Sequence, residues 1–295
     1  MLTNYPNFTK LNISLKNDVE KITNLYDSYS DFNFTSMLCW DFNKNAALST
    51  IGKNLVIKIP DYLTGEDVYS ILGEDNIDES IKKLLLTTPE LKLVPELVVE
   101  NLRKDKDFIV LEDPDNFDYI YYIPEILNLV GKSNKKQRNK LNQFSARYNG
   151  FVVKHISTSQ DIIHKKYLNI FDNWKTRKTD DIEQANERRA IGILLDNIAN
   201  LDVIITEIQI DKVVVGFSIN EKLDDKNAIC HFQKYLANYS NIDTALTFFS
   251  SNKLLEEGCK YVNWEQDLGL KGLKRNKNEY KPHKFLKKYT IKRKD

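Results

Sequence analysis

Apolar positions recur along the second half of the chain with spacings that separate helices from strands. Apolar residues three and four apart predict amphipathic helices, and apolar runs bounded by turn residues predict strands. The two runs on either side of Asp211 and Lys212 predict a β-hairpin. The expected elements, in order, are a strand, two helices, a hairpin, a strand, a helix and a short strand, at Phe151–Ile156, Thr158–Thr176, Asp180–Ala199, Leu201–Ile210, Val213–Glu221, Ile229–Tyr235, Ile242–Glu257 and Tyr261–Trp264.

The first half has a similar rhythm of elements. Strands are expected on both sides of a turn at Gly52–Asn54, within Leu48–Ile59, and at Asp107–Leu111 and Asp118–Ile123. Helices are expected at Lys16–Tyr29, Val68–Ile71, Ile77–Leu86, Leu91–Leu102 and Lys132–Tyr148. This alternation predicts an α/β (α+β) fold in which mixed sheets are flanked by helices. A length of 295 residues allows two domains, expected at residues 1–125 and 126–295.

Charge and composition limit how the chain could bind nucleic acid, a membrane or a metal ion. The net charge of +1 gives no global field for nucleic acid or membrane, so any such partner must meet a local patch. No secretory signal is visible, and no stretch approaches the ~20 apolar residues of a spanning helix. Three scattered cysteines and four histidines give no support for a metal site. These features predict a cytoplasmic protein without a bound metal.

The stretch from Tyr261 to Tyr289 carries the densest chemistry. Glu265 and Asp267 follow an expected strand at a spacing of two, which places both carboxylates on one face if the strand continues. A cationic run with interspersed aromatic residues comes next, and includes Lys271, Lys274, Arg275, Lys277, Tyr280, Lys281, Lys284, Phe285, Lys287 and Lys288. Paired carboxylates beside clustered cations could bind an amine and a phosphate together, although a solvated surface of ion pairs explains the same pattern.

A second basic stretch lies in the middle of the chain, where the sequence runs GKSNKKQRNKLNQF from Gly131 to Phe144. It is expected to form a helix with Leu141 and Phe144 on its apolar side and its cations near the N-terminal half. A helix start after a glycine can bind phosphate through backbone N–H groups. A solvated basic helix face is the competing interpretation.

Both stretches resemble one known family. The final stretch resembles the closing signature of the phosphatidylglycerol lysyltransferase C-terminal-domain family in Asn263, Glu265, Gln266, Asp267, Leu268, Gly269, Gly272, Leu273, Lys274, Lys277, Tyr280 and Pro282. The middle stretch matches a further family pattern in Gly131, Arg138, Asn139 and Phe144. The resemblance implies two tandem GNAT-like units and an acyltransferase that moves an aminoacyl group from aminoacyl-tRNA to a polar acceptor, often a lipid hydroxyl, without a further cofactor.

The candidate residues follow from the chemistry that such a transfer needs. Glu265 and Asp267 are predicted to bind the amine or polarise the nucleophile, and His231 to act as a base. Lys234 or Lys277 could face the oxyanion. Predicted substrate contacts, mainly to tRNA phosphates, are Arg138, Asn139, Lys140, Lys274, Arg275, Lys277 and Tyr280. Strict alternation along Ile229–Tyr235 places His231 and Gln233 on one face of the strand, and Phe232 and Lys234 on the other.

Two other functions fit parts of the sequence. An acyl-CoA-dependent N-acyltransferase of the GNAT fold would need a glycine-rich pyrophosphate loop, and Asn238–Thr244 occupies that place without glycines. A non-catalytic RNA-binding module would need only the basic surfaces. The family's lipid-modifying enzymes usually carry a transmembrane portion ahead of this domain, and none is visible here. The acceptor is therefore expected to be a lipid or a small molecule, with peripheral contact at the inner membrane face as the only membrane association.

The signature also departs from the family pattern at two positions. Trp264 stands where members often have arginine, and Lys274 stands where arginine is usual. Both changes are expected to alter substrate contacts.

Overall fold

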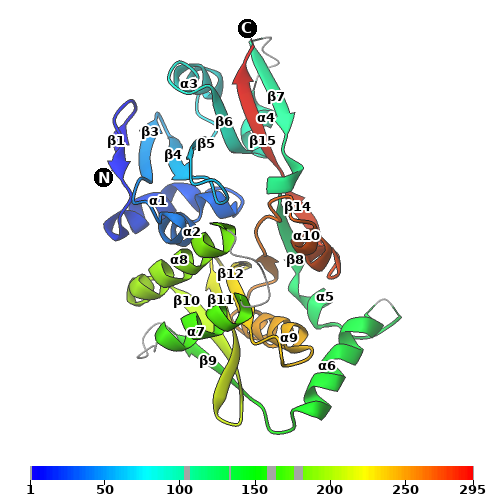
Figure 1. Cartoon of the computed structure of the whole chain (residues 1–295). Helices are drawn as coiled ribbons and strands as arrows, with labels where there is room; N and C mark the ends of the chain where they lie inside the picture. The colour runs from blue at the N-terminus through cyan, green and yellow to red at the C-terminus, as the bar shows by residue number, and fades with distance from the viewer. Residues whose placement is uncertain (1, 103–106, 133, 158–163, 176–181, 295) are drawn as a thin grey trace. The chain divides into compact units, whose positions relative to one another are not determined.

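The computed structural model describes residues 2–102, 107–132, 134–157, 164–175 and 182–294 (Figure 1). The chain divides into two compact units. The first contains Met1–Tyr119, Glu265–Glu279 and Lys284–Asp295, and the second contains Ile120–Trp264 and Tyr280–His283. This differs from the expected continuous division at residue 125, because the last part of the chain packs with N-terminal elements.

The first unit contains two sheets. Strand order in one is β1-β3-β4-β5 with β2 also on β3, and in the other it is β6-β15-β7. The strands of these sheets are β1 (Thr3–Asn4), β2 (Thr9–Lys10), β3 (Ala47–Ile51), β4 (Asn54–Pro60), β5 (Asp67–Leu72), β6 (Glu90–Pro95), β7 (Phe108–Glu112) and β15 (Lys288–Arg293). Strand β14 (Lys284–Leu286) pairs instead with β8 (Asp118–Tyr122). The helices are α1 (Lys16–Thr23), α2 (Phe34–Trp40), α3 (Ile77–Leu84), α4 (Glu96–Asn101) and α10 (Lys271–Asn278).

The first unit confirms the expected strands and corrects three expected helices. Val68–Ile71 is not helical but lies in β5, which pairs antiparallel with β4. The expected helix Leu91–Leu102 divides at Pro95 into β6 and α4, because proline inside a helix loses a hydrogen bond and clashes with the preceding turn. The helix expected over Lys16–Tyr29 ends at Thr23.

The second unit is built on one central sheet, in which the strands run in the order β14-β8-β13-β12-β11-β10-β9. Its strands are β8 (Asp118–Tyr122), which begins in the first unit, β9 (Val152–Ser157), β10 (Val203–Ile210), β11 (Val213–Lys222), β12 (Asn227–Tyr235) and β13 (Tyr261–Asn263). Its helices are α5 (Ile123–Leu127), α6 (Lys135–Arg147), α7 (His164–Lys175), α8 (Ile182–Asn197) and α9 (Ile242–Glu256). Residues 158–163, expected to begin α7, lie outside the described part of the chain.

Helices cover both faces of this sheet. Phe217 in β11 packs against Tyr167 of α7, which marks one face. The neighbouring Gly216 marks the other, because a Cβ there would lie 2.9 Å from Leu246 of α9. The expected hairpin is confirmed as β10 and β11, and Asp211 and Lys212 both have positive φ, as a type I′ turn requires. Helices, a hairpin and then strand–helix–strand is the order of a GNAT unit, so the predicted fold class is confirmed.

A buried ion-pair network joins distant segments of the first unit. Lys288 in β15 is fully buried, and its Nζ forms ion pairs with Asp31 and, at 2.8 Å, with Asp118 Oδ1. Both carboxylates are also fully buried. Burial raises the pKa of Asp31, and the Lys288 ammonium acts in the opposite direction. The ammonium therefore stabilises two charges that would otherwise be costly to bury.

Hydrogen bonds strengthen this network and tie two further segments to it, those of Tyr62 and Gln266. The Ser30 N–H donates to Asp118 Oδ2 at 2.7 Å, and the Tyr62 hydroxyl donates to Asp31 Oδ1 at 2.8 Å. Lys288 Nζ also donates to Gln266 Oε1 at 3.3 Å. Gln266 belongs to the signature loop, so that loop is fixed to the interior of the first unit through its amide.

Replacing Lys288 with methionine is expected to destabilise the protein by about 3–5 kcal/mol, because two buried carboxylates lose their counter-ion. Urea unfolding followed by circular dichroism measures this loss. The Asp31 carboxyl has a pKa above its ordinary value of 3.8, and losing the ammonium raises that pKa further. At pH values above 3.8 the folded variant therefore binds more protons at Asp31 than the unfolded chain does. Its stability falls as the pH rises through that range. The deficit should be larger at pH 8 than at pH 5.

The control is Lys292→Met on the same strand, where the side chain is 46% exposed and pairs with Glu90 at 2.8 Å. Its loss should stay below about 1 kcal/mol, as for other surface pairs. Equal losses for the two variants would contradict the role assigned to Lys288.

Candidate active site

The signature after β13 is a loop and not a continued strand. Strand β13 ends at Asn263, and Glu265, Leu268 and Gly269 have φ values of +57°, +54° and +72°. Gly269 is required there, because a Cβ would lie 2.9 Å from Asp115 Oδ2. The expectation that Glu265 and Asp267 share one strand face is therefore wrong, since the chain turns between them.

Asp267 is fully buried and both of its carboxylate oxygens are engaged. Oδ1 accepts the Gly269 N–H at 2.8 Å, and Oδ2 accepts the hydroxyl of Tyr119. Burial first, and then this bond to Asp267, raise the pKa of Tyr119. These contacts support the turn of the loop, and the predicted catalytic role of Asp267 stays a prediction.

Lys277 holds the same loop from α10. Its side chain is buried, and Nζ donates to the backbone carbonyls of Glu265 at 3.0 Å and Gln266 at 2.7 Å. The ammonium also lies 5.4 Å from the centre of the Tyr119 ring. Glu265 is half-buried, with Oε1 3.4 Å from Ser36 Oγ. Lys277 thus supports the backbone of the signature with its charge.

The remaining predicted contacts of the C-terminal stretch have different surroundings. Lys274 and Arg275 are exposed on α10, and Lys274 Nζ lies 3.6 Å from Asp115 Oδ1. Tyr280, in the second unit, packs edge-to-face on Trp264 with ring centres 5.1 Å apart. The two cations are accessible to an anionic partner, whereas Tyr280 has a packing role.

Helix α6 carries the basic residues predicted to contact phosphate. Arg138 donates to the backbone carbonyls of Leu129 and, at 3.1 Å, Gly131, so it fixes the loop before its own helix. Lys140 forms an ion pair with Asp243 at 3.6 Å, and Asn139 is exposed. Of these three residues, Asn139 and Lys140 remain placed for an external contact.

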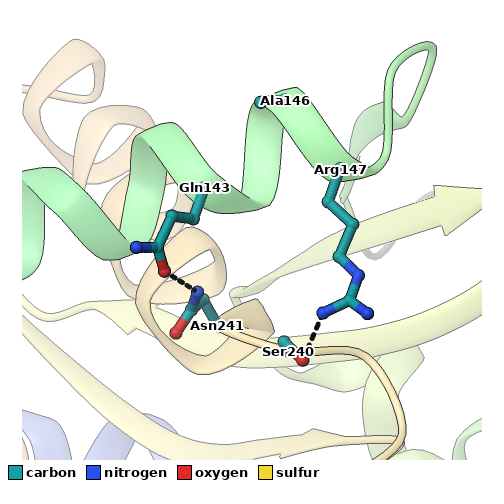
Figure 2. A pocket seen from close by; sticks show the side chains of 5 residues that line it. All are labelled: Gln143, Ala146, Arg147, Ser240 and Asn241. Atoms are coloured by element: carbon teal, nitrogen blue, oxygen red, sulfur yellow. Dashed lines mark hydrogen bonds between the residues drawn. The ribbon is translucent and has the colours of Figure 1, made fainter.

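A cavity of about 610 Å³ lies between the C-terminal half of α6 and the start of α9 (Figure 2). Arg147 donates to Ser240 Oγ at 3.2 Å, and Asn241 Nδ2 donates to Gln143 Oε1 at 3.2 Å. The lining residues are Gln143, Ala146, Arg147, Ser240 and Asn241. None of them is a predicted catalytic residue. A guanidinium beside a helix N-terminus, with no carboxylate in the lining, suits an anionic group.

His231 forms a buried pair with Glu221 on the α7 side of the central sheet. The two side chains are 1% and 4% exposed, and Nε2 lies 3.1 Å from Glu221 Oε2. Strand β12 has one extra residue here, because Ile219 lies opposite Phe232 while Asn220 lies opposite Cys230. This β-bulge turns the His231 ring toward Glu221, so the expectation that His231 and Lys234 lie on opposite faces is wrong.

Lys234 lies on the same side of β12 and is also desolvated. Its Nζ is 2.7 Å from Glu187 Oε1 and 4.1 Å from the ring centre of Trp174. The ring of Phe171 lies 5.7 Å away. The charge of Lys234 is therefore held by a carboxylate from α8 and by an aromatic face from α7.

A third buried carboxylate lies further along this face. Glu207 in β10 accepts hydrogen bonds from the Tyr167 hydroxyl and, at 3.1 Å, from Gln209, and it forms an ion pair with Lys166. Burial and the contact with Glu207 raise the pKa of Tyr167. Glu207 and Lys234 both lie opposite Phe217 in register, so the row crosses three adjacent strands.

Three carboxylate–base pairs lie on one sheet face, and each has at least one partner that is 10% exposed or less. Burying such charges is costly, which is typical of a functional site rather than of a surface. A histidine paired with a carboxylate can accept a proton, and a desolvated lysine can stabilise an oxyanion. His231 and Lys234 thus lie on the same sheet face in the second unit, while Glu265 and Asp267 belong to the loop of the first. We identify the Glu221, His231, Lys234 and Glu187 group as the candidate active site.

Sequence reasoning did not include Glu221, Glu207, Glu187 or Trp174 among the candidate site residues. A signal for Glu221 was present, because it continues the face of the apolar Phe217 and Ile219 on one strand. Glu187 and Lys234 come from distant elements, and no local pattern links them.

Two further searches bear on the type of site. Among the described residues, no group of three or more His, Cys, Asp or Glu side chains is arranged to hold a metal ion. Over the same part of the chain, every helix is too short or too polar to cross a bilayer.

Comparison with known proteins places this geometry in a family. Residues 23–292 match the family described as phosphatidylglycerol lysyltransferase, C-terminal. An uncharacterized protein of Mycoplasmoides gallisepticum is 26% identical over 187 residues, which cover 62% of this chain and 58% of that protein. The match therefore spans less than two thirds of that relative.

Solved structures share the fold. A Bacteroides thetaiotaomicron protein of unknown function has a TM-score of 0.84 at 21% identity, covering 97% of this chain and 99% of that one. The C-terminal domain of a putative lysylphosphatidylglycerol synthetase from Agrobacterium fabrum has a TM-score of 0.63 at 13% identity, covering 94% and 91%. L-PGS from Bacillus licheniformis has a TM-score of 0.62 at 14% identity, covering 100% and 94%. This chain belongs to the phosphatidylglycerol lysyltransferase C-terminal-domain family.

Proposed function

We propose that this chain transfers an aminoacyl group from aminoacyl-tRNA to a lipid or a small polar acceptor. Membership of the family supports a transferase, and the donor and acceptor are the proposal. The observation that carries it is the buried His231–Glu221 pair beside Lys234, because ester aminolysis or transesterification needs a proton acceptor and a stabilised oxyanion.

The step balances with these residues alone. The acceptor's hydroxyl or amine bonds to the ester carbonyl carbon while His231 takes its proton. Glu221 stabilises the imidazolium, and Lys234 lies beside the developing oxyanion. The carbon–oxygen bond to tRNA then breaks, and the released ribose oxygen takes the proton from His231. The donor ester is already activated, so no further cofactor is required.

The His231 and Glu221 side chains are only 1% and 4% exposed, so we propose that a substrate reaches this pair where two strands part. Strand β12 runs parallel to β13 only over Asn227–Ile229, and β13 ends at Asn263 while β12 continues to Tyr235. The bulge at His231 lies just beyond the last paired residue. A substrate entering between the diverging strands would approach the candidate base from its backbone side.

The second unit also has groups for an anionic donor. The cavity at Arg147, Ser240 and Asn241 and the exposed Asn139 of α6 suit phosphates of an RNA. In the first unit Lys274 and Arg275 are accessible, and Glu265 stays a candidate for binding the donor's amine. A lipid acceptor would bring the protein to a membrane surface as a peripheral partner.

An acyl-CoA-dependent N-acyltransferase is the second candidate, because the same cavity at the start of α9 would suit a pyrophosphate. The absence of glycine from Asn238–Thr244 counts against it. A non-catalytic RNA-binding module is the third, and it would have no use for the buried base.

The test is transfer of labelled amino acids from total charged tRNA, with lipid extract and small metabolites as acceptors and labelled acetyl-CoA in a parallel reaction. His231→Gln should lower the transfer rate by about 100-fold or more, because a positioned base contributes 10²–10⁴. Release of label from tRNA into an RNase-resistant product is the readout.

The matched control is His155→Gln, since His155 is exposed on β9 and bonds to Thr206. It should keep the wild-type rate. Transfer that survives His231→Gln would remove His231 from the reaction, and label taken only from acetyl-CoA would favour the second candidate. Binding of tRNA with no transfer in either reaction would favour the third.

Asp267→Asn is expected to lower stability rather than chemistry, since both oxygens already bond within the first unit. A loss of about 1–3 kcal/mol is typical when a buried hydrogen-bond partner is impaired. Thermal unfolding and the transfer rate per folded molecule separate the two roles. A 100-fold slower rate at unchanged stability would instead establish Asp267 as catalytic.

A further inference from the structure

Strand β7 is the outer strand of the β6-β15-β7 sheet, and among the described strands it pairs with β15 alone. Phe108, Ile109, Val110 and Leu111 are four successive apolar residues, so both faces of the strand are apolar. Ile109, Val110 and Leu111 are 40%, 37% and 49% exposed. An exposed apolar strand at a sheet edge is a template for pairing with another strand.

The outer strand of the second unit has a different character. Strand β9 also ends its sheet, and beside the exposed apolar Val152 it exposes Lys154, His155 and Ser157. Charged and polar residues on an edge discourage pairing with other chains. The run of three exposed apolar residues on β7 has no such polar residue within it.

The core of the first unit continues up to β7 and remains open there. Val110 lies opposite Ile291, which is fully buried in a cluster with residues of α3 and β6. Phe108 packs partly against the same cluster. Val110 nevertheless leaves more than a third of its surface in solvent. One more strand beyond β7 would cover this side of the core.

We propose that the free edge of β7 pairs with β7 of a second copy of this chain, antiparallel about a two-fold axis at Val110. This register places Val110 opposite the partner's Val110, Ile109 opposite the partner's Leu111, and Phe108 opposite the partner's Glu112. It keeps the core-facing residues of both strands on the same side. A two-fold axis closes the assembly as a dimer.

Charge favours a second copy over an unrelated extended peptide. Arg293 of β15 lies opposite Phe108 within one copy. In the dimer, Arg293 and the partner's Glu112 flank Phe108 on the same face, about 10 Å apart at their Cα atoms across two strand spacings. Glu112 forms an ion pair with Lys287 of its own chain at 3.3 Å, and half of its side chain is exposed. It can therefore also meet the partner's Arg293 over that ring, and the two-fold axis repeats the contact.

The five-residue strand supplies few hydrogen bonds, so the dimer is expected to be weak, with a dissociation constant between about 1 μM and 1 mM. Sedimentation equilibrium of the full chain across that range measures it. Leu111→Lys should weaken association at least 10-fold, because a lysine then faces the partner's Ile109. The matched control, Val213→Lys, changes a residue that is 56% exposed on β11, and should leave association unchanged.

A charge exchange tests the register itself. Glu112→Arg and Arg293→Glu should each weaken the dimer, and the double variant should restore most of the loss. Circular dichroism and thermal unfolding confirm that each variant is folded. A chain that stays monomeric at every concentration would overturn the proposal. The proposal would also be overturned if Leu111→Lys left the dissociation constant of the dimer unchanged, or if the double variant did not recover association.

Discussion

The ammonium of Lys288 lies in the interior of the first unit between two fully buried carboxylates. Four parts of the chain meet at this charge: the segment of Ser30 and Asp31, the start of β8, the signature loop through Gln266, and the last strand. If any of these segments separated from the others, a buried charged group would lose a partner or become exposed. The course of the chain, which returns to its first unit only at the end, is therefore fixed by electrostatics as well as by apolar packing.

The two units use buried charge for different purposes. In the first unit the ionic groups are saturated: Lys277 bonds to backbone carbonyls, and Asp267 bonds to a hydroxyl and an amide. In the second unit carboxylates and basic side chains line one face of a sheet, and His231 contacts the Glu221 carboxylate. An imidazole that is oriented by a carboxylate can accept a proton, which an ammonium bonded to carbonyls cannot do. This contrast supports the proposal that the chemistry lies at His231, while the roles predicted for Glu265 and Asp267 stay predictions.

Much of the fold could be predicted from the sequence, and much less of the site. Strong periodicity and a two-residue turn identified the hairpin and the helices around it, because those signals are local. The strand β5 was missed since its short apolar run fits either helix or strand, and only pairing with β4 decides between them. The loop at Glu265 was missed because positive φ angles there are held by Lys277, twelve residues away. The pair of Glu187 and Lys234 depends on the packing of α8 against the sheet, which no spacing reveals.

Strand β12 has one residue more than β11 between Cys230 and Phe232, and that single residue decides which side of the sheet receives an imidazole. Strict alternation along the strand would place the His231 side chain on the α9 side of the sheet. The extra residue of the bulge places it on the α7 side instead. A relative whose β12 is one residue shorter would align with this sequence before and after that one-residue gap. Its histidine would nevertheless lie on the α9 side of the sheet. An insertion or deletion of one residue in this strand would thus relocate a proton acceptor without altering the fold, so the length of β12 is itself a determinant of the chemistry.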